Sequence, residues 1–182
     1  MSKGLEELFT DHANMRVLLQ MLEHELDRYR DGKTPDFELV QSMINDIIVF
    51  QNLVHHPKED LVFARLIQRE PKGAEPILDL LTDHARLAIV SRRFAAGLHD
   101  IASGIEVRRD WFDQLLSEFL TAIRSHMNLE ERKFFPRAAD CLSDEDWREI
   151  DAMMEKIKGL RISATVAETK LWLNHGSGES VD

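Results

Sequence analysis

Apolar residues recur at alternating intervals of three and four along most of the chain, the spacing that places side chains on one face of an α-helix. Glycine and proline, which end or restart helices, lie between these stretches, as at Gly32, Pro35 and Gly104. Pro57 interrupts the second stretch, where it either kinks one long helix or begins a new one. The pattern predicts an all-α protein with long helices over residues 5–29, 44–66, 77–101 and 112–134.

The connections between these helices are short, so consecutive helices should be antiparallel neighbours. The predicted fold is an up-down-up-down antiparallel four-helix bundle over residues 1–140. A shorter apolar stripe, preceded by the capping pair Ser143 and Asp146, predicts an additional C-terminal helix within residues 141–173, packed on the bundle. Residues 174–182 are predicted to form a disordered tail.

The tetrapeptide Thr-Asp-His-Ala occurs twice and places a histidine on the apolar face of the first and third helices. His12 and His84 are 72 positions apart, and the stripes around them superpose residue for residue. His55 and His126 lie on the apolar faces of the second and fourth helices, 71 positions apart. His12 and His55 are each about 19 residues, or roughly 28 Å, from the loop joining their helices. His84 and His126 are separated from the loop between their own helices by nearly the same number of residues. We therefore expect all four histidines to meet at one height in the core.

A glutamate follows the histidine of the second helix and that of the fourth helix by four residues: Glu59 follows His55, and Glu130 follows His126. Residues four apart lie on the same face of a helix, so the carboxylates join the histidines. Four imidazoles and two carboxylates in an apolar interior are costly unless a pair of cations satisfies them. With bridging carboxylates, open positions remain for water, hydroxide or dioxygen. The predicted metal ligands are His12, His55, Glu59, His84, His126 and Glu130.

Three polar residues next to these positions need separate interpretations. Asp11 and Asp83 each precede a predicted ligand, and they could either accept a hydrogen bond from a ligand or be ordinary surface acids. His56 follows His55 and lies about 100° further round a regular helix. We expect His56 to lie outside the ligand set or to be partly exposed.

The charge balance limits the classes of partner. The chain has 23 Lys and Arg against 33 Asp and Glu, a net charge of −10, which argues against a phosphate-binding surface and against nucleic acid. No apolar run is long enough to span a bilayer, and the N-terminus has no secretory signal pattern. The single cysteine, Cys141, cannot form an internal disulfide. We expect a cytoplasmic monomer or homodimer with no membrane partner.

The chain also resembles a known family. The segments DHANM, HHPKEDLVF, DHARL and HMNLEERKFFPRA resemble bacterial hemerythrin-like proteins of the HHE cation-binding family, and the resemblance extends over about residues 5–138. It implies a hemerythrin-like four-helix bundle around a non-haem di-iron centre, with two iron ions joined by an oxo or hydroxo bridge. By the same resemblance, His12 and His55 would hold one iron, His84 and His126 the other, and Glu59 and Glu130 would bridge them.

The chain departs from the oxygen-carrying hemerythrins at two places. Those proteins have a His-x-x-x-His on the third helix, whereas Leu80 and Ala88 lie four residues before and after His84. Their second bridging acid is an aspartate five residues after its histidine, whereas Glu130 follows its histidine by four. One histidine ligand is therefore missing, and a further side chain such as Glu23 or His56 could be recruited.

These observations favour a di-iron protein that binds or senses O2, NO or peroxide, or that holds iron. One alternative is a di-iron oxidase or peroxidase, although nothing in the sequence identifies a substrate pocket. Another is a structural or partner-binding bundle with a different divalent metal or none, in which Met153, Met154 and Trp172 pack against a second protein.

Overall fold

The structure, a computed structural model, describes residues 2–33, 35–70 and 75–157. These residues contain helices and no β-strand, which confirms the all-α prediction. A further helix occupies residues 144–157, at the end of the described part of the chain. The preceding elements are α1 (Lys3–Arg30), α2 (Phe37–Phe50), η1 (Gln51–His55), α3 (His56–Arg69), α4 (Glu75–Ala102), α5 (Arg109–Leu129), η3 (Glu130–Phe134) and α6 (Phe135–Cys141).

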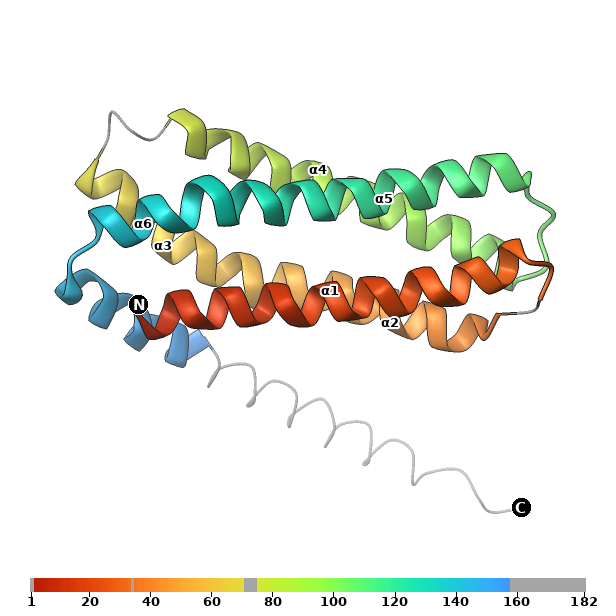
Figure 1. The fold of residues 1–182 in the computed structure, drawn as a ribbon, viewed down its shortest axis with the longest axis horizontal. Coiled ribbons are helices and arrows are strands. Elements are labelled where there is room, and N and C mark those ends of the chain that lie inside the picture. The colour runs from red at the N-terminus through yellow and green to blue at the C-terminus, as the bar shows by residue number, and fades with distance from the viewer. Residues whose placement is uncertain (1, 34, 71–74, 158–182) are drawn as a thin grey trace, which may run out of the picture.

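Four long helical rods lie side by side and make the predicted antiparallel bundle (Figure 1). Two of the rods are single helices, α1 and α4. The other two are composite, since α2, η1 and α3 follow one another without a break, as do α5, η3 and α6. Helix α1 contacts α2 and α3, α4 contacts α5 and α2, and α3 contacts α6.

The two loops at one end of the bundle use the same glycine termination. Gly32 and Gly104 have positive φ angles of 76° and 79°, the left-handed conformation that glycine adopts without a side-chain clash. After each glycine, the next N–H returns to a carbonyl five residues earlier: Lys33 to Arg28 and Ile105 to Asp100. Asp36 then caps α2 by accepting a hydrogen bond from the N–H of Leu39 at 3.0 Å. The sequence signals for the ends of these helices are therefore confirmed.

Both composite rods contain one π-helical turn, and a proline follows each turn. In η1 the N–H of His56 donates to the carbonyl of Gln51, and Pro57 comes next. In η3 the N–H of Phe135 donates to the carbonyl of Glu130, and Pro136 comes next. A proline has no N–H and its ring clashes with the carbonyl four residues earlier, so a wider turn accommodates it. Pro57 thus lies in the first turn of a new helix, α3, which is the second of the two predicted alternatives, although α3 continues the rod without a break.

The apolar core is divided into two clusters, and the predicted ligands lie between them. Along α1, for example, Leu8 belongs to one cluster and Met15 to the other, with His12 between. Along α4, His84 lies between Leu80 and Leu87 in the same way. Each rod is therefore apolar on both sides of one polar layer, and that layer is held at a constant height by packing above and below it.

The 144–157 helix packs against the end of the bundle where the chain begins (Figure 1). Ser143 and Asp146 form the predicted capping pair, because each backbone N–H donates to the other residue's side chain. Asp146 also accepts from Arg69 of α3 at 2.8 Å, and Asp151 accepts from the N–H of Gly4 in α1 at 2.8 Å. The remainder of the predicted appended helix, with Trp172, and the predicted tail lie outside the described residues.

Candidate metal centre

The six side chains predicted as metal ligands converge on one place in the bundle core. Each rod contributes at least one of them. The side chain of His84 is 12% exposed, and the other five are 5% exposed or less. The contributing elements are α1 for His12, η1 for His55, α3 for Glu59, α4 for His84, α5 for His126 and η3 for Glu130.

The inward nitrogens of the first histidine pair are as close as two ligands of one metal. His12 Nε2 and His55 Nε2 are 2.9 Å apart. Two nitrogens at about 2.1 Å from a metal and at right angles to each other would be about 3 Å apart. In the second pair, the rings of His84 and His126 have centroids 4.9 Å apart and are inclined at 70°.

Each buried carboxylate directs one oxygen to each histidine pair. Glu59 Oε1 is 3.3 Å from His55 Nε2, and its Oε2 is 3.4 Å from His84 Nε2. Glu130 Oε2 is 3.2 Å from His12 Nε2, and its Oε1 is 2.9 Å from His126 Nε2. This is the arrangement that two carboxylates need in order to bridge two cations.

The outward nitrogens of three histidines are bonded to carboxylates. The pairs are His12 Nδ1 with Glu131 at 2.9 Å, His55 Nδ1 with Asp11 at 3.3 Å and His126 Nδ1 with Asp83 at 3.4 Å. In a neutral imidazole, an Nδ1–H that donates to a carboxylate leaves the lone pair on Nε2, which is the form that binds a metal in place of a proton. Of the two interpretations of Asp11 and Asp83, acceptance of a hydrogen bond from a histidine is therefore correct.

Each aspartate of the repeated tetrapeptide holds a histidine of the neighbouring rod, not the histidine that follows it. Asp11 also accepts from the ammonium of the buried Lys58 at 2.8 Å. Burial alone raises the pKa of Asp11, but the hydrogen bonds from His55 and Lys58 outweigh this and lower it. Asp11 is thus an anion that orients the imidazole of His55.

Several polar atoms in this layer have no hydrogen bond within the described residues. They are both oxygens of Glu59 and Glu130 and the Nε2 atoms of His56, His84 and His126. With a proton on Nδ1, His126 presents a lone pair toward Glu130, so two acceptors face each other at 2.9 Å. Buried acceptors that face one another are costly unless a cation lies between them. The residues therefore fit a metal centre in both chemistry and geometry.

The electrostatics of the layer also favour positive charge. Burial on its own lowers the pKa of His55 and His84, because it disfavours the charged imidazolium. The carboxylates outweigh burial, chiefly Glu59 with Asp11 for His55 and Glu130 with Glu59 for His84, and raise these pKa values to about 10 and about 9. Burial raises the pKa of Glu130, but the imidazoles of His12, His126 and His84 beside it hold this pKa well below its usual range.

Comparison with known families identifies this arrangement. The family model described as the hemerythrin HHE cation-binding domain matches residues 3–138, which include every residue of the polar layer. The chain belongs to the hemerythrin HHE cation-binding family. Comparison with curated proteins gave no match, and comparison with solved structures gave none either.

Membership of the hemerythrin HHE family indicates that the chain binds a metal cation. The described residues contain two groups of side chains that could hold one. The two groups share Glu59 and are His12, His55, Glu59 and Glu130 on one side, and His56, Glu59, His84 and His126 on the other.

Among the described helices, none is long and apolar enough to cross a membrane.

The position of His56 corrects the sequence prediction. Of the two expected alternatives, partial exposure is wrong, because the residue is only 7% exposed and its ring stacks on that of His84. Burial, together with the charges of His84 and His55, lowers the pKa of His56 to about 2, so its imidazole is neutral. The prediction assumed a regular helix, and the π-turn that ends at His55 brings two consecutive histidines inward.

The other candidate for an extra ligand does not enter the hemerythrin-type layer. Glu23 lies further along α1 and accepts a hydrogen bond from Arg124 at 2.8 Å. Sequence reasoning also missed Glu131, which holds His12 and pairs with Arg16 at 2.6 Å. The one feature of the sequence that pointed to Glu131 was its position next to Glu130. Two consecutive residues of a helix project about 100° apart, so Glu131 can lie at the edge of the layer that Glu130 enters.

Proposed function

We propose that this protein holds a non-haem centre of two iron ions and takes up a small exogenous ligand there, such as O2, NO or peroxide. Its role would be to sense or handle that ligand, or to hold iron. The observation that carries the proposal is the pair of buried carboxylates, Glu59 and Glu130, each with one oxygen toward either histidine pair. One metal would need only one side of this arrangement.

Each protein group has a distinct part in such a centre. His12 and His55 would hold one iron and His84 and His126 the other, with the two glutamates shared. The glutamates supply two negative charges inside an apolar core, which favours binding of a cation pair over retention of protons. The bound iron would supply redox activity and open coordination positions.

The oriented carboxylates around the centre prepare it for metal. Asp11, Asp83 and Glu131 each fix an imidazole ring by its Nδ1 atom, so the Nε2 atoms already face inward. Packing above and below the layer prevents the rods from sliding past one another. Little reorganisation should then accompany metal loading.

Metal analysis of the full chain, purified from iron-supplemented cells, tests the proposal. We expect about two iron ions per chain, and an absorption spectrum that chelation and reduction abolish. A protein that still binds clearly fewer than two metals per chain after anaerobic reconstitution would contradict the two-metal centre.

The exogenous ligand is tested on the reduced, iron-loaded protein. Addition of NO, or of O2 in a separate sample, should change the absorption spectrum, and removal of the gas should show whether the change reverses. Apo-protein treated in the same way is the control. An iron-loaded spectrum that neither gas nor peroxide alters would restrict the function to holding iron.

A further inference from the structure

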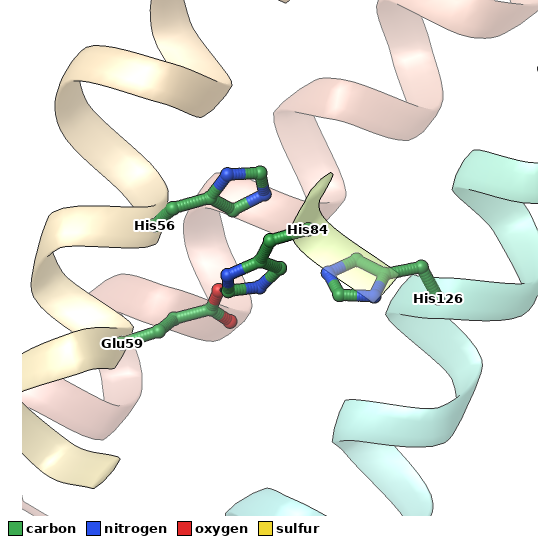
Figure 2. A group of neighbouring side chains, drawn as sticks. All are labelled: His56, Glu59, His84 and His126. Carbon is green, nitrogen blue, oxygen red and sulfur yellow. The ribbon is translucent and has the colours of Figure 1, made fainter. Parts of the chain in front are cut away.

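The ring of His56 lies in the polar layer although it is not one of the predicted ligands. Figure 2 shows His56 from α3 on the same side of the layer as Glu59, with His84 and His126 facing them. The centroids of His56 and His84 are 3.9 Å apart and their planes are inclined at only 13°. The buried Nε2 of His56 has no hydrogen-bond partner among the described residues. Such an atom is costly to bury unless something binds it.

The backbone explains how this ring reaches the layer. The N–H of His56 bonds to the carbonyl of Gln51, five residues earlier, so the turn before it holds one residue more than a regular helical turn. Pro57 follows directly and cannot take part in an ordinary helical hydrogen bond at this point. The extra residue lets both His55 and His56 face inward, where a regular helix would turn one of them aside.

The donor atoms around His56 are close to the spacing of a single coordination shell. One ligand atom from each of His56, Glu59, His84 and His126 lies within 4.8 Å of the others. Two ligands on opposite sides of a metal, each at about 2.1 Å, would be about 4.2 Å apart. To complete the shell, these side chains would have to move inward and the ring of His56 would have to turn out of its parallel stack on His84, because two imidazoles on one metal point to a common centre.

We propose that His56 is a third imidazole ligand of the metal held by His84 and His126. The two metals then differ in their ligands, since the other has only His12 and His55, while Glu59 and Glu130 serve both. This inference rests on the proposed two-metal function. It assigns the extra ligand to the second helical rod, where the turn before Pro57 places it.

A competing role for His56 is to support the ring of His84 by stacking alone. The variant His56→Phe distinguishes the two roles, because phenylalanine keeps a flat buried ring and cannot bind metal. His24→Phe is a matched control, since His24 is an exposed histidine within a helix. His56→Gln, which is smaller than histidine, provides a second variant if the phenylalanine overfills the site.

The experiment is anaerobic titration of full-length apo-protein with Co2+, in competition with a chelator. The wild type should bind two equivalents. In His56→Phe the first equivalent should bind as in the wild type, and the second should bind at least about 10-fold more weakly with shifted visible absorption bands. The spectrum of paramagnetically shifted imidazole N–H protons should contain one signal fewer than that of the wild type.

The outcomes separate the two proposals. If wild-type protein binds fewer than two equivalents, the proposed two-metal function fails. If it binds two, and folded His56→Phe or His56→Gln binds both with wild-type affinity, spectrum and number of shifted N–H signals, then His56 is not a ligand. Weak binding in His56→Gln together with normal binding in His56→Phe would show that stacking is what matters, and would overturn the assignment. Circular dichroism verifies that each variant is folded.

Discussion

The polar layer has two halves, a first half around His12 and His55 and a second half around His84 and His126. They are related by the sequence repeat, yet they have different surroundings. In the first half, the acids that hold His12 and His55 are themselves bound to cations: Glu131 to Arg16, and Asp11 to Lys58. In the second half, Asp83 holds His126 but its nearest cation, Arg86, is 3.7 Å away and largely exposed. Helical repetition therefore reproduces the histidines and the aspartate that holds one histidine in each half, but not the cations behind them.

The second half is also nearer to solvent. The side chain of His84 is 12% exposed, against 2% for His12 at the repeated position. A groove of about 500 Å³ runs beside α4 and α5, and Asp83 is one of its lining residues. We therefore expect the first half to be the more rigid and the second half to be the one that solvent and small molecules reach.

The largest effect should come from a change that weakens both halves at once. Glu59→Ala removes a carboxylate with one oxygen toward each half. Bound iron should fall from about two to fewer than one per chain, because each metal would lose a negatively charged ligand. Metal analysis after reconstitution measures this. Glu38→Ala, at an exposed position of α2, is the control, and retention of two metals by Glu59→Ala would refute the bridging role.

Changes to the orienting aspartates should act on one half each. Asp11→Asn and Asp83→Asn keep the size of the side chain but remove its charge. Each should weaken metal binding in its own half by about 10-fold to 100-fold, with the larger effect for Asp11 because it is less exposed. Chelator competition on the two variants measures the difference. Equal effects would show that the surroundings of the two halves are functionally equivalent.

The cations behind the two halves should differ in their contribution to stability. Lys58→Met leaves Asp11 without its ammonium partner in a buried position, which should lower the free energy of unfolding by about 2 kcal/mol. Arg86→Met removes an exposed charge from the second half and should change the free energy of unfolding by less than about 0.5 kcal/mol. Urea unfolding of the metal-free proteins measures both. Similar losses in the two variants would contradict the proposed difference in rigidity.

The smallest effect concerns the 144–157 helix, which contacts α1 and α3 at the end of the bundle, outside the polar layer. The hydrogen bond from Arg69 is the main cause that lowers the pKa of Asp146, with burial opposing it and Ser143 assisting. Because the folded pKa lies below the unfolded value of about 4, this carboxylate stabilises the fold fully above pH 4. Its contribution is lost as the pH falls below 4 through the folded pKa.

The variant Asp146→Asn tests this dependence. Its deficit in urea midpoint relative to the wild type should be present at pH 7 and should shrink at pH 3. Asp144→Asn, at an exposed position in the same helix, should show no such change. A deficit that is equal at both pH values would mean that Asp146 acts through packing and not through its charge.

The convergence of the six predicted ligands could be predicted from the sequence because it follows from regular helix geometry. His12 and His84 lie on apolar stripes, and Glu59 and Glu130 follow their histidines by one helical turn. The heights of these residues depend only on counts of residues along rods joined by short loops. Local hydrogen bonding sets that geometry, so the sequence is sufficient to predict it.

The remaining features required the packed structure. Whether His56 faces inward depends on the π-turn before Pro57, and an apolar period cannot reveal an inserted residue of that kind. Which histidine Asp11 or Glu131 would hold depends on how far each rod is rotated against its neighbour.

The sequence by itself thus determined the helical rods, the height of the polar layer and six of its side chains. Only the tertiary structure decided the inward position of His56, the outer hydrogen bonds and the unequal exposure of the two halves. The physical reason is that the first set arises from hydrogen bonds within one helix. The second arises from contacts between helices, which no single stripe encodes.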